Sequence, residues 1–177
     1  HIAATYRFDQ FSGGHVRVLA AEQTPDSDVW FQGTADAVRR SMRYFKDDRP
    51  DLVVILSGDQ LYRMNVQEVI DTHLKSGAEI TVSTTPVDRE AARSLGIMQV
   101  NDQGQVVQFV EKPAENAVLE GLAVNDRQDA FLASMGIYVF NMDVLCSLLE
   151  QNNQTDFGKH IIPEAIHSHR VFSHVFE

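Results

Sequence analysis

The sequence LVVILSGD at residues 52–59 begins with five consecutive apolar residues and ends in serine, glycine and aspartate. Such an apolar run, ended by turn-forming residues, is typical of a strand buried on both faces of a parallel sheet. In open α/β sheets, ligands bind beyond the carboxyl ends of the strands. Asp59 is therefore the first candidate for chemistry, as a ligand of a nucleotide-bound metal. A loop aspartate that accepts hydrogen bonds from its own backbone is the alternative, and the residues alone leave both open.

The segments on either side of this run alternate between strand and helix patterns. Asn65 and Glu68, for example, have the spacing of a capping box at the start of a helix. The expected elements are a strand over 15–20, a helix capped at Thr34 that ends before Pro50, a helix from Asn65 to about Leu74 and a strand over 79–84. This order predicts an α/β domain with a mostly parallel, mixed sheet that is covered by helices.

The second half of the chain is richer in β-patterned segments. The expected elements are strands over 97–100 and 106–110 joined as a hairpin, a polar loop over 114–130, a strand over 135–140, helices over 143–149 and 161–166, and a last strand from Val171. We therefore expect one domain, or part of one, over residues 1–177.

Composition excludes several classes of function. The chain has 177 residues, 25 of them acidic and 15 basic, with no basic run or aromatic-interleaved basic stripe, so nucleic-acid binding is not expected. No stretch approaches the roughly 20 apolar residues that span a bilayer, so we expect a soluble protein without a membrane partner. The single cysteine, Cys146, suits a reducing compartment and is interpreted as a packed thiol.

Two segments could contact a phosphate, each with a structural alternative. The sequence WFQGTADA at residues 30–37 places small residues at a helix start, where backbone N–H groups could meet a base or a phosphate. An ordinary capped helix is the commoner origin of this pattern. In FVEKP at residues 109–113, Lys112 offers a point charge to a phosphate and Glu111 an acceptor to a hydroxyl-rich ligand. A solvated hairpin end is the alternative there.

Ser134 opens SMGIYVF at residues 134–140 and could hydrogen-bond a sugar, although a serine at this point in a strand is usually structural. The histidines near the end of the chain do not have the spacing of a zinc site, and we interpret them as a solvated group. They are His160, His167, His169 and His174.

Taken together and in this order, these segments resemble the ADP-glucose pyrophosphorylase family, also called glucose-1-phosphate adenylyltransferases. The stretches that carry the resemblance are WFQGTADAVR at 30–39, SGDQLYRM at 57–64, FVEKP at 109–113, SMGIYVF at 134–140 and DFG at 156–158. They run through nearly the whole chain. Any one of them would leave the wider sugar nucleotidyltransferases open, but the combination is specific.

The resemblance implies a Rossmann-like nucleotidyltransferase domain that uses ATP, glucose 1-phosphate and Mg²⁺ to form ADP-glucose and pyrophosphate for glycogen or starch synthesis. It also implies a role for each matching residue. Asp59 would bind the metal, Lys112 the phosphate of glucose 1-phosphate, Glu111, Ser134 and Gly96 the glucose, and Gly33, Thr34 and Ala35 the adenine end, while Trp30 would lie in a loop linked to allosteric activation. A homotetramer in the cytoplasm, or in a plastid if the source is a plant, is implied as well.

The resemblance also predicts which family elements this chain lacks. The glycine-rich basic loop and first strand would precede His1, and a second metal-binding aspartate and a C-terminal β-helix would follow Glu177. Residues 1–177 are therefore expected to be a partial catalytic domain that is inactive alone. Asn65 and Val66 depart from the usual aspartate and aromatic residue, with little effect expected on the chemistry.

Two other functions stay open at this point. One is a nucleotidyltransferase that uses another base or sugar. The other is a catalytically silent regulatory subunit that binds a sugar nucleotide, against which the retention of Asp59 and Lys112 argues.

Overall fold

The computed structural model describes residues 14–19, 30–58, 63–124 and 130–176. The chain divides into two compact units, His1–Gln32 and Gly33–Glu177. In the first unit, residues 14–19 form no helix or strand, so the strand expected over 15–20 is wrong for its described part. A strand requires a pairing partner, and the alternating Val16 and Val18 are instead 41% and 69% exposed. Ala20 lies outside the described residues.

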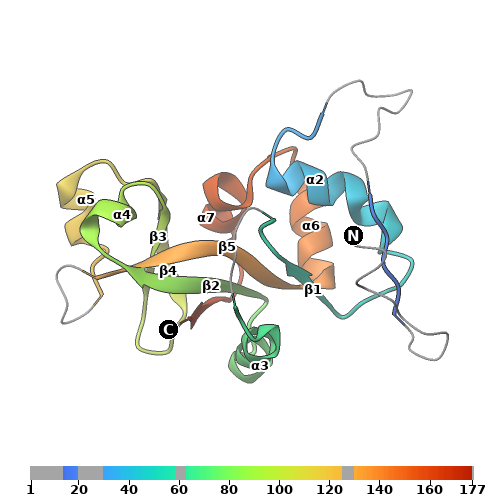
Figure 1. Cartoon of the computed structure of the whole chain (residues 1–177), viewed down its shortest axis with the longest axis horizontal. Helices are drawn as coiled ribbons and strands as arrows, with labels where there is room; N and C mark the ends of the chain where they lie inside the picture. The colour runs from blue at the N-terminus through green and yellow to red at the C-terminus, as the bar shows by residue number, and fades with distance from the viewer. Residues whose placement is uncertain (1–13, 20–29, 59–62, 125–129, 177) are drawn as a thin grey trace. The chain divides into compact units, whose positions relative to one another are not determined.

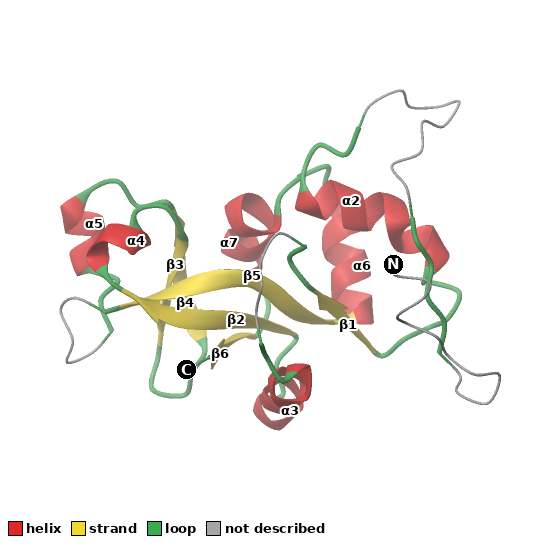
Figure 2. Cartoon of the chain, viewed as in Figure 1, coloured by secondary structure: helices red, strands yellow, loops and turns green. Residues whose placement is uncertain are grey.

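The second unit contains the described helices and strands (Figures 1 and 2). Its helices are α2 (Thr34–Ser41), the short 3₁₀ helix η1 (Met42–Tyr44), α3 (Val66–Ser76), α4 (Arg89–Ala92), α5 (Asn116–Glu120), α6 (Met142–Gln151), the π-helix η2 (Phe157–Ile161) and α7 (Ile162–Ala165). Its strands are β1 (Leu52–Ile55), β2 (Ile80–Val87), β3 (Gly96–Val100), β4 (Val106–Glu111), β5 (Phe131–Asn141) and β6 (Val171–Val175).

The six described strands form one open, mixed sheet in the order β4-β3-β5-β2-β6, with β1 also paired to β5. β1, β2 and β3 are antiparallel to β5, and β2 is parallel to β6. Four strands, β1, β2, β3 and β6, therefore share one direction, and the predicted helix-covered α/β fold is confirmed. The hydrogen-bonded neighbours are nevertheless mostly antiparallel, because β5 inserts between β1 and β2. A strand-helix-strand order gives no warning of that insertion.

β1 is less buried than its sequence predicts. Leu52–Ile55 are each partly buried, and Leu56, which follows the strand, is 47% exposed. Among the described strands β1 pairs with β5 alone, so it is an edge strand of the described sheet. The expectation of a strand buried on both faces is therefore wrong for the described structure.

The start of α3 follows the predicted capping chemistry. The Asn65 side chain accepts a hydrogen bond from the Gln67 N–H at 3.2 Å and donates one to Glu68 at 3.0 Å. Gly77 ends the helix in the left-handed conformation, with φ of 63°, which glycine adopts at little cost. At α2 the structure differs by one residue, because Gly33 is the N-cap and Thr34 is already helical.

The sheet packs against different layers on its two faces. On one face α2, α6 and α7 bury the larger core, which includes Phe140, Leu145 and Ile162. α3 lies on the opposite side of the strands (Figure 1). A smaller core around Leu119, Leu122 and Phe131 lies beneath α4 and α5. The segment expected to be an irregular loop over 114–130 thus contains the helix α5, because its few apolar side chains are buried.

Candidate active site

A cleft of about 680 Å³ opens where one edge of β5 is left unpaired. β2 pairs with one edge of β5 along nearly its whole length, so β1 and β3 both pair with the other edge. On that edge β1 pairs with residues 138–141 and β3 with residues 132–133, which leaves residues 134–137 between them. The residues that follow β1 and precede β3 therefore face each other across this gap. Such a division of a sheet is where α/β proteins commonly bind ligands.

One wall of the cleft is formed by Ile55–Gly58, the residues that continue β1 beyond its carboxyl end. Asp59, the predicted metal ligand, follows Gly58 directly in the sequence but lies outside the described residues. Ser94–Gly96 form the opposite wall, immediately before and at the start of β3. The end of β1 therefore borders the cleft, while its use as a ligand site and the role of Asp59 stay predictions.

Glu111 lines the cleft at the end of β4, in close contact with two glycines. A Cβ on Gly96 would lie 2.8 Å from Oε2 of Glu111 and 2.6 Å from the ring of Phe109, so a larger residue there would require these side chains to shift. A Cβ on Gly158 would lie 3.4 Å from the same oxygen. The predicted sugar residues Gly96 and Glu111 are thus side by side.

The Glu111 carboxylate is in an electrostatically unusual place. Burial raises the pKa of Glu111, the positive charge of Lys112 lowers it, the negative charge of Asp156 raises it and Lys159 lowers it. Burial has the largest effect, so the pKa of the carboxyl is above its usual range. A partly desolvated carboxylate of this kind is a strong acceptor for ligand hydroxyl groups.

Ser134 and Tyr138 lie on the unpaired stretch of β5 and its border. Between the pairs Val82–Tyr138 and Thr84–Ser134, β5 has three residues and β2 has one, so β5 bulges into the cleft. Gly136 permits the bulge with a φ of 68° and donates its N–H to the Ser134 Oγ at 3.3 Å. Burial raises the pKa of Tyr138 to about 12, so this hydroxyl stays protonated at neutral pH.

Asp156 is a cleft residue that the sequence analysis included in a motif but did not assign to the site. It lines the cleft and caps η2, where its Oδ1 accepts from the Lys159 N–H at 2.8 Å. The next residue, Phe157, is 1% exposed and its ring centroid lies 5.4 Å from that of Tyr138. The DFG motif therefore fixes the cleft floor through an aromatic contact. The signal in the sequence that could have identified it is the aspartate directly before an aromatic residue and a glycine.

Lys112 lies at the margin of the cleft and is not one of the described residues that line it. It has a left-handed φ of 49°, and its N–H donates to the Leu95 carbonyl at 3.0 Å. Both Leu95 and the preceding Glu111 line the cleft, while the Lys112 side chain is exposed. The lysine is thus anchored by its backbone beside the cleft, with a side chain free to reach a ligand.

The start of α2 differs from the expected open anion site. The Ala35 N–H donates to the Thr155 carbonyl at 2.9 Å and the Asp36 N–H donates to it at 3.3 Å, so the chain itself occupies these donors. A Cβ on Gly33 would lie 2.4 Å from this carbonyl oxygen, which explains the glycine. Of the three residues predicted for the adenine end, Thr34 lines the cleft, whereas Ala35 is fully buried and Gly33 packs against Thr155.

Trp30 belongs to the first unit and is 71% exposed. It is therefore described only within that unit, apart from the cleft residues, and its link to allosteric activation stays a prediction.

The cleft offers limited ligands to a metal. Glu111 and Asp156 are the carboxylates among its described lining residues, and one oxygen of Asp156 already accepts the η2 cap. Among residues 14–19, 30–58, 63–124 and 130–176, no group of three or more histidine, cysteine, aspartate or glutamate side chains could hold a metal. This donor set fits a cation held by one carboxylate and by substrate phosphates, which is the usual mode for Mg²⁺.

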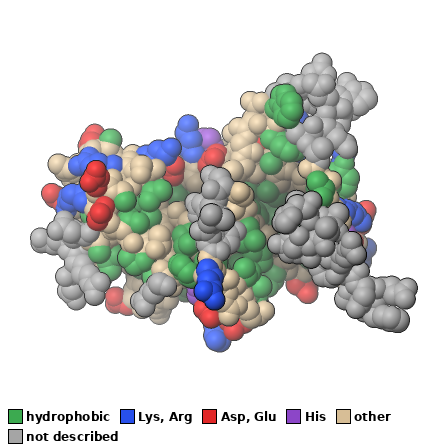
Figure 3. Space-filling model, viewed as in Figure 1, with side chains coloured by type: hydrophobic (Ala, Val, Ile, Leu, Met, Phe, Trp, Pro, Cys, Tyr) green, Lys and Arg blue, Asp and Glu red, His purple; other side chains and the backbone are tan. Residues whose placement is uncertain are grey.

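On the face shown in Figure 3, acidic and basic side chains lie interspersed around the described surface. Within the described part of the chain, no helix combines the length and apolar character that crossing a membrane would need.

A family model described as nucleotidyl transferase matches residues 1–177, the full length of the sequence.

Proposed function

This chain belongs to the nucleotidyl transferase family, and from that premise we propose that it transfers an adenylyl group from ATP to glucose 1-phosphate. The products are ADP-glucose and pyrophosphate, for glycogen or starch synthesis. Family membership supports nucleotidyl transfer in general, and the resemblance of the sequence motifs supports this particular donor and acceptor.

The observation that carries the proposal is the Glu111 carboxylate in the divided sheet. The absence of a side chain at Gly96 leaves space for it, Gly158 lies beside it, and Ser134, Tyr138 and Asp156 line the same cleft. A small group of acceptors and hydroxyls around an otherwise mainly apolar cleft suits a hydroxyl-rich ring such as glucose. Burial disfavours the charge of this carboxylate, so Glu111 lowers the stability of the fold at neutral pH, and a role in ligand binding would account for its position.

The proposed reaction requires positioning more than proton transfer. Glucose 1-phosphate is ionised at neutral pH, so one of its phosphate oxygens attacks the α-phosphorus of ATP in line while the bond to pyrophosphate breaks. No protein base has to remove a proton. Glu111 would orient the sugar by accepting hydrogen bonds from its hydroxyls, and the Ser134 hydroxyl would donate or accept one. Lys112 would hold the phosphate of the sugar phosphate. The protonated Tyr138 would contribute a neutral donor.

Mg²⁺ is part of this proposal, with Asp59 as its protein ligand and substrate phosphates as the others. When bound, it would neutralise charge that develops on the phosphoryl oxygens.

The nucleotide would lie toward α2, where Thr34, Ala37 and Val38 line the cleft. Since the Gly33 and Ala35 backbone is packed against Thr155, Thr34 is the residue of this motif best placed to contact adenine. Allosteric control through the Trp30 segment and a homotetrameric, cytoplasmic or plastid enzyme complete the proposal.

The test is product formation by the natural full-length protein with Mg²⁺. ATP, GTP, CTP, UTP and dTTP are each paired with glucose 1-phosphate, and ATP is then paired with other sugar 1-phosphates. We expect ADP-glucose to form fastest, and Glu111→Ala to raise the KM for glucose 1-phosphate more than that for ATP. Glu120→Ala, an exposed glutamate on α5, is the matched control.

Two results would redirect the proposal. Faster turnover with another nucleotide or sugar would retain a nucleotidyltransferase with different substrates. Binding of ADP-glucose without turnover of any pair would support the silent regulatory subunit.

A further inference from the structure

The described lining of the cleft is negatively charged, and so are its proposed ligands. Glu111 and Asp156 line it, and the described lining residues include no lysine or arginine. A sugar phosphate carries close to two negative charges at neutral pH, because its second phosphate pKa is about 6. Bringing such a dianion to two carboxylates requires cations at the cleft margin.

Two lysines, from different parts of the fold, act on the Glu111 carboxylate. The positive charges of Lys112 and Lys159 both lower the pKa of Glu111, against the larger effect of burial. Lys112 follows β4, whereas Lys159 lies in η2, immediately after Gly158. Because a Cβ on Gly158 would lie 3.4 Å from Glu111 Oε2, η2 approaches the carboxylate closely. The two lysines therefore come to the same carboxylate from two separate elements.

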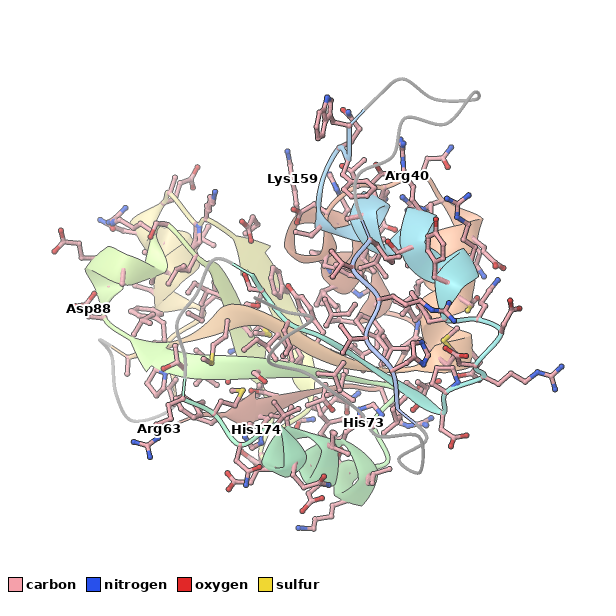
Figure 4. The ribbon with its side chains drawn as sticks, turned by 45° about the vertical axis from the view of Figure 1, so that its right-hand side comes forward. Arg40, Arg63, His73, Asp88, Lys159 and His174 are labelled. Carbon is pink, nitrogen blue, oxygen red and sulfur yellow. The ribbon has the colours of Figure 1, made fainter. Side chains whose placement is uncertain are left out.

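The backbone of Lys159 is fixed while its side chain is available. Its N–H donates to Asp156 Oδ1 at 2.8 Å, and Phe157 anchors the same helix in the core. The side chain is exposed and points away from the sheet in Figure 4. Within the described structure, the Lys159 ammonium has no hydrogen bond or ion pair, in contrast to Lys46, which pairs with Glu150.

We propose that Lys159 binds the phosphate group of the sugar phosphate, as a second cation beside Lys112. The two lysines would flank the phosphate and offset its repulsion from Glu111 and Asp156. The inference rests on the proposed function only in requiring an acceptor that carries a phosphate. It makes Lys159 a substrate-binding residue that favours a phosphorylated sugar over the free sugar.

The experiment compares steady-state kinetics of the natural full-length protein with those of Lys159→Gln, Lys159→Arg and Lys75→Gln. Lys75 is an exposed lysine on α3 and serves as the matched control for removing one positive charge. Losing one charge-assisted contact should raise the KM for the sugar phosphate by about 10- to 100-fold. The KM for the nucleotide should change less than about twofold, and Lys159→Arg should restore most of the loss.

Three outcomes would overturn the inference. The KM for the sugar phosphate could stay unchanged in Lys159→Gln, the KM for the nucleotide could rise instead, or Lys75→Gln could have an equal effect. A lower Tm with normal kinetics would likewise show that Lys159 only stabilises the fold.

This test remains separate from that of the proposed function. If the wild-type protein prefers another nucleotide or another sugar phosphate, the comparison is made with that pair. Only the identity proposed for the substrate would then fail, and the same KM changes would still decide the role of Lys159.

Discussion

At the scale of single residues, Glu111 occupies a position that favours ligand binding over stability. Its pKa is raised chiefly by burial, so the folded chain binds a proton at this carboxyl more readily than the unfolded chain does. Such a group stabilises the fold fully below its unfolded pKa, and this contribution is lost as pH rises through the folded pKa. At neutral pH the charged Glu111 therefore opposes folding.

Glu111→Gln tests whether the charge of Glu111 lowers stability and strengthens ligand binding. Removal of the disfavoured charge should raise the Tm at pH 7.5, and the gain should shrink as pH falls toward 4.5, the ordinary pKa of glutamate. The amide is a weaker acceptor, so the KM for glucose 1-phosphate should rise by at least about 10-fold. Thermal melts across this pH range and initial-rate kinetics provide the measurements. A lower Tm at pH 7.5 together with an unchanged KM would contradict both expectations.

Gly33 is required by the backbone of a distant loop. Alanine there would place its Cβ 2.4 Å from the Thr155 carbonyl oxygen, which also accepts the Ala35 N–H. Backbone on both sides cannot yield as a flexible side chain could, so Gly33→Ala should lower the free energy of unfolding by about 1–3 kcal/mol. Urea denaturation measures the change. Gly121→Ala, whose nearest contact would be a carbonyl oxygen at 3.6 Å, should stay within about 0.5 kcal/mol, and equal losses in the two variants would refute the argument.

At the scale of elements, α3 is joined to the sheet by histidines as well as by apolar contacts. His73 is 1% exposed, and its two ring nitrogens lie 2.9 Å from Thr81 Oγ1 and from Asn141 Oδ1. On β6, Nδ1 of His174 lies 2.8 Å from Thr72 Oγ1, and Figure 4 labels both histidines. The sequence analysis missed this interface, because His73 has no polar partner near it in sequence. The partners are brought together by β2, β5 and β6.

The His174 contact should make the attachment of α3 sensitive to acid. Burial lowers the pKa of His174 below its ordinary value of 6.5, although Glu68 opposes the shift. The unfolded chain therefore binds the proton first, so stability is intact above pH 6.5 and falls as pH drops through the folded pKa. The Tm should fall more between pH 7.5 and 5.5 in the wild type than in His174→Gln. Parallel curves would exclude this role, and exposed His167→Gln is the control.

Helices and strands with capping residues or a clear hydrophobic pattern were predictable from the sequence. The order of the strands in the sheet was not. The capping-box spacing of Asn65 and Glu68 identified α3, and the hairpin of β3 and β4 followed from its strand patterns. The insertion of β5 between β1 and β2 depends on packing between distant segments, which no periodicity records. The same holds for the site, since Glu111 and Ser134 were recognised as motifs, whereas their proximity follows from the gap in the sheet.

At the scale of the whole molecule, the proposed reaction brings two polyanions to a protein of net charge −10. The cleft adds Glu111 and Asp156, and the described cations near Glu111 are Lys112 and Lys159. These two described lysines carry less charge than ATP, a sugar phosphate and two carboxylates do together. The balance of charge therefore favours a reaction that depends on a divalent cation.

Removal of divalent cations should consequently stop the reaction in the natural full-length protein. With excess EDTA, ADP-glucose formation should fall by at least about 100-fold, and Mg²⁺ should restore it. KCl at matched ionic strength should not restore it, because screening alone does not orient phosphates.

Asp59→Asn should raise the Mg²⁺ concentration needed for half-maximal rate, with Asp71→Asn on α3 as the control. Since phosphates supply the remaining ligands, Asp59→Asn should weaken nucleotide binding only when Mg²⁺ is present, as calorimetry with and without the cation would measure. Full turnover in EDTA, or an unchanged Mg²⁺ requirement in Asp59→Asn, would contradict the metal role assigned to this aspartate.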